Sequence, residues 1–170
     1  MSMVEKLESP ELYRFLTIMT PFVLFILMVL GSYVKAIGAG LACPDWPLCH
    51  GQLIPLEYGN YSFVGVMAEW VHRLVALVVG FMLLGLLSLS YVNRDEKRGD
   101  IAVGMKRVKL MVLIMILLVV QFFLGGFTVL LLLDEYVVTS HLAFATIILG
   151  LSILHWFWQT PSYQPQIRNT

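Results

Sequence analysis

The chain has 170 residues, of which 59% are hydrophobic and 13% are charged, and its formal net charge at pH 7 is zero. Its mean hydropathy of +0.83 is far above that of a soluble domain. The composition therefore excludes an ordinary soluble enzyme. The sequence has neither a basic surface nor a strand-turn-helix phosphate loop, so it does not indicate a nucleic-acid or nucleotide partner. An integral membrane protein is predicted.

Four stretches are long and apolar enough to cross a bilayer as helices, since a hydrocarbon core of about 30 Å needs about 20 helical residues. They cover roughly residues 15–35, 66–91, 108–133 and 137–158. We therefore predict an all-α membrane protein, a four-transmembrane-helix bundle that forms one domain over residues 1–170. The first stretch is too long for the apolar region of a signal peptide, so we expect it to remain as a helix.

The basic residues predict the orientation of the bundle. Nine of the eleven Lys and Arg residues fall on one side of this arrangement, and only Lys35 and Arg73 fall at the opposite face. Positive residues accumulate on the cytoplasmic side of membrane proteins. We therefore expect a multi-pass protein of the plasma membrane with both termini and the 92–107 loop in the cytoplasm. The 36–65 loop and the short turn near Asp134 then face outward.

The outer 36–65 loop, between the first two helices, is the longest non-helical stretch. Its proline, glycine and aromatic residues favour a lid packed on the bundle. It holds the only two cysteines, Cys43 and Cys49, on the oxidising side, where a disulfide is expected. A short ring with two prolines predicts a reducible, redox-active bond. A simple loop staple is an equal alternative, and a metal site that includes His50 matches no common ligand spacing.

Two histidines, His72 and His141, each lie about one helical turn inside an apolar segment, and both segments enter the membrane from the outer side. Burying imidazole in lipid is costly, so an intramembrane histidine indicates a functional site. Two at matched depth are placed to clamp one haem iron between them. The alternative is that each ring forms a hydrogen bond within the bundle, with Gln121 as a candidate partner of His141.

The residues near these histidines fit such a cofactor. Glu69 lies one turn outward of His72 on the same helix face, and Arg73 lies where a guanidinium can pair with a haem propionate. The alternative is an interfacial ion pair between Glu69 and Arg73. Gly125 and Gly126 open room either for a flat macrocycle or for close helix packing.

The two halves of the chain form a weak internal repeat, because in each half the second helix begins outside and carries a histidine early. A fourth histidine, His155, follows His141 by fourteen residues, but the matching position after His72 is Leu86. A second bis-histidine site within one chain is therefore excluded. We expect His155 near the inner membrane face.

Together these segments resemble the haem A synthase family of cytochrome oxidase assembly. The resemblance rests on four pieces in the same order and on the same helices: Gly38–Cys49, Glu69–Leu74, Gln121–Leu130 and His141–Leu142. It covers nearly the whole chain. Most of the family has two such four-helix halves with a haem in each, whereas this chain has one.

The resemblance implies that the chain oxidises the C8 methyl group of haem O to a formyl group by successive hydroxylations, giving haem A for terminal oxidases. It implies that His72 and His141 are axial ligands of the haem iron, and that Glu69 is the catalytic acid–base or stabilising carboxylate. Cys43 and Cys49 would serve redox or haem transfer. The cofactor-binding residues that it implies are His72, His141, Arg73, Gly125, Gly126 and Gln121.

Two other functions fit the histidines. One is a non-catalytic b-type cytochrome that carries haem B and relays electrons, and the other is an assembly factor that delivers haem unchanged. Neither requires Glu69 beside His72, nor the cysteine loop. Because this chain matches one half of a typical member, we expect a closed homo-oligomer, a dimer or trimer, to supply a second haem site. Haem O synthase and the quinone pool are the expected partners.

Overall fold

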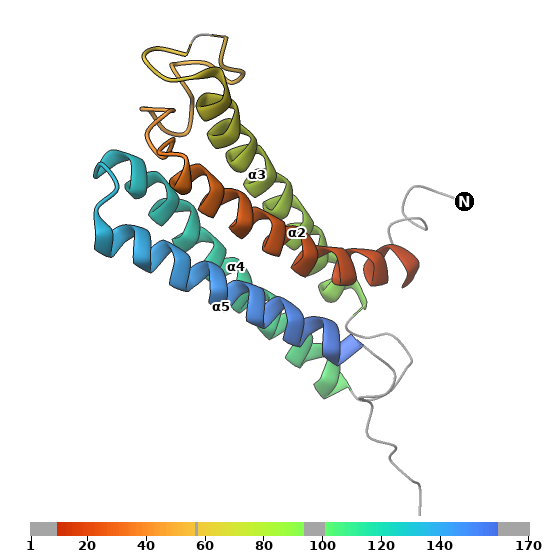
Figure 1. Cartoon of the computed structure of the whole chain (residues 1–170). Coiled ribbons are helices and arrows are strands. Elements are labelled where there is room, and N and C mark those ends of the chain that lie inside the picture. Colours follow the sequence, from red (N-terminus) through yellow and green to blue (C-terminus); the bar gives the residue numbers. More distant parts are fainter. Residues whose placement is uncertain (1–9, 57, 94–100, 160–170) are drawn as a thin grey trace, which may run out of the picture.

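The computed structural model of the chain describes residues 10–56, 58–93 and 101–159, and for residues 10 and 101–103 the backbone alone. This part forms four helices (Figure 1), which are α2 (Pro10–Ala36), α3 (Phe63–Val92), α4 (Ile101–Leu130) and α5 (Glu135–Gln159). Each helix is long and apolar enough to cross a membrane. The predicted all-α membrane protein is confirmed.

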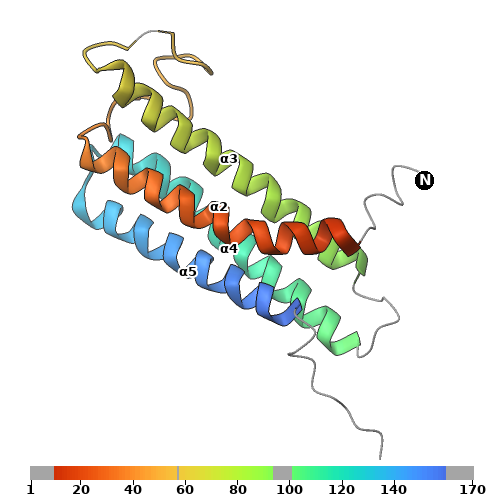
Figure 2. The same cartoon turned by 45° about the vertical axis from the view of Figure 1, so that its right-hand side comes forward.

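The helices pack in the order α2–α3–α4–α5 around the bundle, since each contacts its neighbours in sequence and α2 also contacts α5. Figures 1 and 2 show successive helices running in opposite directions. Consequently α3 and α5 lie diagonally opposite each other. Residues 37–62 and the α4–α5 turn cap one end, which we call the loop end.

Apolar side chains fill the middle of the bundle, and others cover its outside. The central cluster brings together buried residues from all four helices: Leu24, Leu83, Met111, Ile114 and Ile148. Large apolar side chains on the outer faces are exposed, among them Phe25, Phe81, Ile116 and Ile147. Because lipid is as apolar as these side chains, such faces suit contact with hydrocarbon, and close packing holds the helices together.

The helices form two pairs, α2–α3 and α4–α5, and the first helix of each pair ends in the same hydrogen-bond pattern. At the end of α2, the N–H of Gly38 bonds to Lys35 O and that of Ala39 to Val34 O. At the end of α4, the N–H of Leu132 bonds to Val129 O and that of Leu133 to Thr128 O. These are Schellman motifs, which need a left-handed residue, here Gly38 (φ +72°) and Leu132 (φ +52°).

This motif corrects one predicted boundary. The apolar run had suggested a span over 108–133, but α4 ends at Leu130. Leu132 and Leu133 both adopt positive φ, which reverses the chain, and the Asp134 carboxylate then accepts the N–H groups of Tyr136 and Val137 at the start of α5. Hydropathy cannot register a turn that is built from leucines.

The end opposite the loop end contains a polar network that crosses the bundle. The hydroxyl of Tyr13 on α2 lies 3.0 Å from Ser90 Oγ on α3 and 3.2 Å from His155 Nε2 on α5, and it accepts a bond of 2.7 Å from Gln159. His155, expected near the inner face, is only 2% exposed. The network therefore joins three helices at this end.

The predicted orientation in the membrane depends partly on basic residues that the structure does not describe. The termini and the charged stretch 94–100 lie outside the described residues. Their cytoplasmic placement stays a prediction.

Candidate functional site

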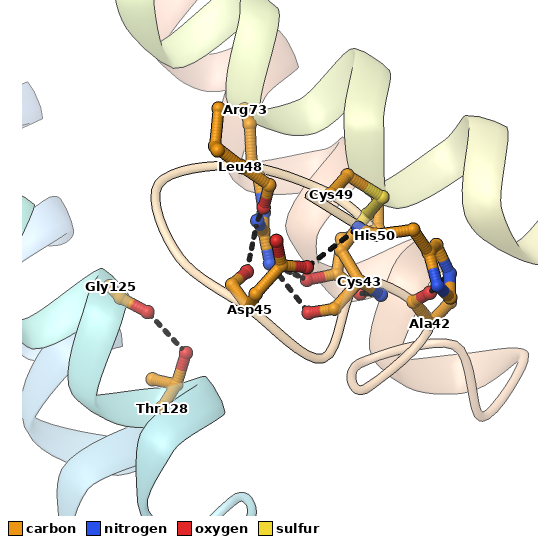
Figure 3. A network of polar contacts seen from close by, with 10 residues as sticks. Ala42, Cys43, Asp45, Leu48, Cys49, His50, Arg73, Gly125 and Thr128 are labelled. Carbon is orange, nitrogen blue, oxygen red and sulfur yellow. Dashed lines mark hydrogen bonds and ion pairs between the residues drawn. A yellow bond between two sulfur atoms is a disulfide. The ribbon is translucent and has the colours of Figure 1, made fainter. Parts of the chain in front are cut away.

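The cysteine loop is a compact structure at the loop end of the bundle (Figure 3). Cys43 and Cys49 are joined by a disulfide, and both are buried. The carboxylate of Asp45 accepts the N–H groups of His50 at 2.6 Å and Gly51 at 2.7 Å. The ring of His50 bonds through Nε2 to Ala42 O at 2.9 Å. With both sulfurs in the disulfide, the alternative of a metal site formed by the cysteines and His50 is excluded.

Arg73 attaches this loop to α3. Its Nη1 donates to the carbonyls of Asp45 at 2.8 Å and Leu48 at 2.5 Å, and its Nη2 donates to Cys43 O at 3.0 Å. The remaining Nη2 hydrogen goes to Glu69 Oε1 at 2.6 Å. All four terminal N–H groups are therefore in use, and only Nε–H is left for another acceptor such as a propionate.

Glu69 is a carboxylate beneath the loop. It is 5% exposed and forms an ion pair with Arg73 from the same helix. Its second oxygen, Oε2, accepts the backbone N–H of Cys43 at 3.2 Å. A buried charge requires such partners, because removing it from water costs several kcal/mol. The predicted ion pair is present, and it links the disulfide loop directly to the carboxylate.

Asp45 is the loop's own titratable carboxyl group. Burial by itself would raise its pKa, but the N–H groups of Gly51 and His50 and the charge of Arg73 outweigh burial. The pKa of Asp45 is therefore lower than the ordinary value for aspartate. The loop conformation favours the ionised carboxylate.

The loop also contacts the second helix pair, through Trp46. An added Cβ at Gly126 on α4 would lie 2.9 Å from Trp46 Cδ2. The Trp46 ring also meets Phe122 edge-on, with 4.5 Å between ring centroids. Gly126, predicted to admit a macrocycle, thus admits a tryptophan, and a macrocycle would reach this backbone only after Trp46 moved. Figure 3 shows the loop beside the α4 segment that carries Gly125.

The two predicted ligands lie on the diagonally opposite helices α3 and α5. The ring of His72 packs against Gly31 of α2, and the ring of His141 packs against Gly125 of α4. Sequence reasoning missed Gly31. A lone glycine in an apolar helix carries no sequence signal that marks such a contact.

The polar atoms around these rings leave bonding capacity unused. Nδ1 of His72 and of His141 and Oε1 of Gln121 are buried without a hydrogen bond of ordinary geometry. The Leu27 carbonyl of α2 interacts with the His72 ring, and Gln121 Nε2 lies 3.4 Å from His141 Nε2. No cluster of three or more ligating side chains occurs among residues 10–56, 58–93 and 101–159. Two imidazoles on opposite helices fit haem, because the macrocycle supplies the other iron ligands.

Comparison with known proteins assigns this arrangement to a family. Residues 14–169 match the model of a family described as cytochrome oxidase assembly protein. Over 80 residues the chain is 38% identical to a haem A synthase of Symbiobacterium thermophilum, which covers 46% of this chain and 24% of the relative. Over 134 residues it is 32% identical to a haem A synthase of Chelativorans sp., covering 75% of this chain and 35% of the relative.

A third relative has a different name. A protohaem IX farnesyltransferase of Halobacterium salinarum is 30% identical over 79 residues, covering 46% of this chain and 17% of the relative. The chain spans about a quarter to a third of the length of the two haem A synthases that it matches. No solved structure matches it.

Proposed function

This chain belongs to the cytochrome oxidase assembly protein family, and we propose that it acts as a haem A synthase. In this proposal it oxidises the C8 methyl group of haem O to a formyl group. The observation that carries the proposal is the pair of imidazoles, His72 and His141, on diagonally opposite helices, with the buried carboxylate of Glu69 one turn from His72 on α3. A relative named haem A synthase matches 75% of this chain.

His72 and His141 would hold the haem from α3 and α5. When bound, haem supplies the redox chemistry, and the protein supplies position and electrostatics. The unpaired buried ring nitrogens and Gln121 offer the polar surroundings in which axial ligands are oriented. Gly125 lies against His141 and so belongs to this pocket.

Glu69 is proposed as the residue that accepts and returns a proton at the reacting edge. Its Oε1 is held by a short bond to Arg73, whereas Oε2 has the longer bond to the Cys43 N–H. Oε2 is therefore the oxygen at which we place proton transfer. Arg73 keeps the carboxylate in place and, through Nε–H, would approach a propionate.

The disulfide loop is proposed to serve redox chemistry or haem transfer. Cys43 and Cys49 lie next to Glu69 in space, because the Cys43 N–H bonds to that carboxylate. Reducing the pair would therefore act on the same carboxylate that we assign to catalysis. The simple loop staple remains the competing role for these cysteines.

The setting of the reaction is a membrane, which four apolar helices support. We propose that the cysteine loop faces outward and the termini face the cytoplasm of a plasma-membrane protein, because basic residues accumulate on the other side. Similarity to a protohaem IX farnesyltransferase supports a place near farnesylated haem, with haem O as substrate. We also propose that the chain associates with itself and exchanges electrons with the quinone pool. The mass of the purified complex tests the self-association.

Haem extraction tests the function. The chain is co-expressed with an enzyme that makes haem O, and the haem bound to the purified protein is separated by chromatography. We expect haem A or its hydroxylated precursor. Haem B alone, with haem O abundant in the membranes, would contradict a synthase and support an electron relay.

A further inference from the structure

A glycine on α2 meets the first histidine ring more closely than any side chain could. A Cβ built on Gly31 would lie 2.9 Å from His72 Cε1 and 3.5 Å from each ring nitrogen. Carbon atoms in good contact are about 3.5–4.0 Å apart. A methyl group at residue 31 would therefore force the His72 ring to turn or to move.

The second histidine has a counterpart of the same kind on α4. A Cβ built on Gly125 would lie 3.2 Å from His141 Cε1, 3.8 Å from Nδ1 and 4.0 Å from Nε2. This contact is tight but less tight than the one at Gly31. In both pairs, the first helix thus presents bare backbone to the imidazole of the second helix.

Other helical glycines of the chain differ. A Cβ on Gly80 of α3, or on Gly150 of α5, would meet nothing within 4 Å. Glycine destabilises a helix interior relative to alanine. Gly31 and Gly125 are the helical glycines that lie against a histidine ring, whereas the equally tight Gly126 lies against Trp46.

We propose that Gly31 and Gly125 are positioning residues that seat the rings of His72 and His141 and thereby set the orientation of the two axial ligands. The inference rests on the proposed function for the ligation itself, but the seating is a property of the chain alone. Each ring faces the helix backbone most closely through Cε1 and not through a ring nitrogen, so that one nitrogen can bind the iron while the other binds a partner that orients the ring. The contact of Gly31 with the His72 ring is closer than that of Gly125 with the His141 ring.

A cycle of variants without haem tests the seating directly. Thermal denaturation of the full purified chain is compared for Gly31→Ala, His72→Ala and the double variant. We expect Gly31→Ala to lower Tm when His72 is present and to raise it, or leave it unchanged, in the His72→Ala background, where no ring opposes the methyl group. The same change in both backgrounds would overturn the proposal, and Gly80→Ala should not lower Tm in either.

The haem-loaded protein tests the consequence. Gly31→Ala should shift the electron paramagnetic resonance g values and the midpoint potential of the low-spin haem and lower haem affinity about tenfold, in the range for residues that orient metal ligands. Gly125→Ala should give smaller shifts, and Gly80→Ala and Gly150→Ala should give none. Equal spectra for Gly31→Ala and Gly80→Ala would overturn the positioning role. If the unsubstituted chain gave no bis-imidazole signal, the proposed function would fail, while the denaturation cycle would still decide the seating.

Discussion

The α2–α3 and α4–α5 pairs have the same framework. In each, a glycine of the first helix packs on a histidine of the second, and the first helix ends in a Schellman motif. In each, the left-handed residue of that motif follows the glycine by seven residues, as Gly38 follows Gly31 and Leu132 follows Gly125. This agreement supports the weak repeat predicted from sequence.

The pairs differ in what surrounds the histidine. Three residues before His72 stands Glu69, whereas the matching residue before His141 is Val138. The helices of the first pair are joined by residues 37–62 and a disulfide, those of the second by a short turn. Under the proposed function, ligation would be shared between the pairs, whereas acid–base chemistry would belong to the first.

The largest effect should come from removing either histidine. His72→Ala and His141→Ala should each lower the haem content of the purified protein by at least about 10- to 100-fold, because losing even a residue that only orients a metal ligand costs that much. The pyridine haemochrome assay measures this content. Full haem content in one of the two variants would show that the pairs do not share the cofactor.

Glu69→Gln should separate catalysis from binding. The amide keeps the size and most hydrogen bonds of the carboxylate, so haem content should stay near normal, while conversion of haem O falls about 10²- to 10⁴-fold. Chromatography of the extracted haem gives the rate. As a matched control, Val138→Ala changes the same position of the second pair and should leave conversion unchanged. If Glu69→Gln converted haem O at the normal rate, the assignment of acid–base chemistry to Glu69 of the first pair would be wrong.

Arg73→Gln should release the cysteine loop from α3. The variant loses charged donors to three loop carbonyls and leaves the buried Glu69 without its ion-pair partner, which we expect to cost about 3 kcal/mol. Hydrogen exchange of the loop backbone should rise strongly. Leu142→Ala, the matching position after His141, should change stability by less than about 0.5 kcal/mol. Unchanged exchange in Arg73→Gln would contradict the attachment of the loop.

Tyr13→Phe tests how the two pairs are held together. Loss of the hydroxyl leaves Ser90, His155 and Gln159 short of a partner, so the free energy of unfolding should fall by about 1–3 kcal/mol. Haem content and spectrum should not change, because the network lies at the end opposite the loop. A shifted haem spectrum would show that the two ends are coupled.

Acid should loosen the loop of the first pair with a predictable sign. The pKa of Asp45 is lower in the folded loop than in an unfolded chain, so its stabilising effect is complete above the ordinary carboxyl range, near about pH 4, and is lost as pH falls through the folded pKa. The protection of the residue 45–51 amides against exchange, relative to the intrinsic exchange rate at each pH, should therefore fall in acid. Asp45→Asn should exchange faster at neutral pH and lose this dependence; the same acid response in Asp45→Asn would assign it to another group.

Features that depend on composition or chain pattern could be predicted from the sequence. Apolar runs indicated four helices, and the oxidising outer face favoured the disulfide of Cys43 and Cys49. The cost of burying imidazole singled out His72 and His141. Each of these signals comes from the residue itself or its near neighbours.

Contacts made with backbone could not be predicted in the same way. Arg73 binds carbonyl groups, which every residue has, so the sequence suggested a propionate instead of Asp45, Leu48 and Cys43. Gly31 is a lone glycine in an apolar helix, where plain helix packing is the usual explanation. The contact between Trp46 and Gly126 joins distant segments, and only the fold brings them together.

The most direct measurement is the electron paramagnetic resonance spectrum of the oxidised, haem-loaded chain. We expect a low-spin signal from two imidazole ligands, which disappears in His72→Ala and in His141→Ala and persists in Glu69→Gln. A signal that survives in either histidine variant, or a high-spin signal from the unsubstituted chain, would contradict a haem shared between the two helix pairs.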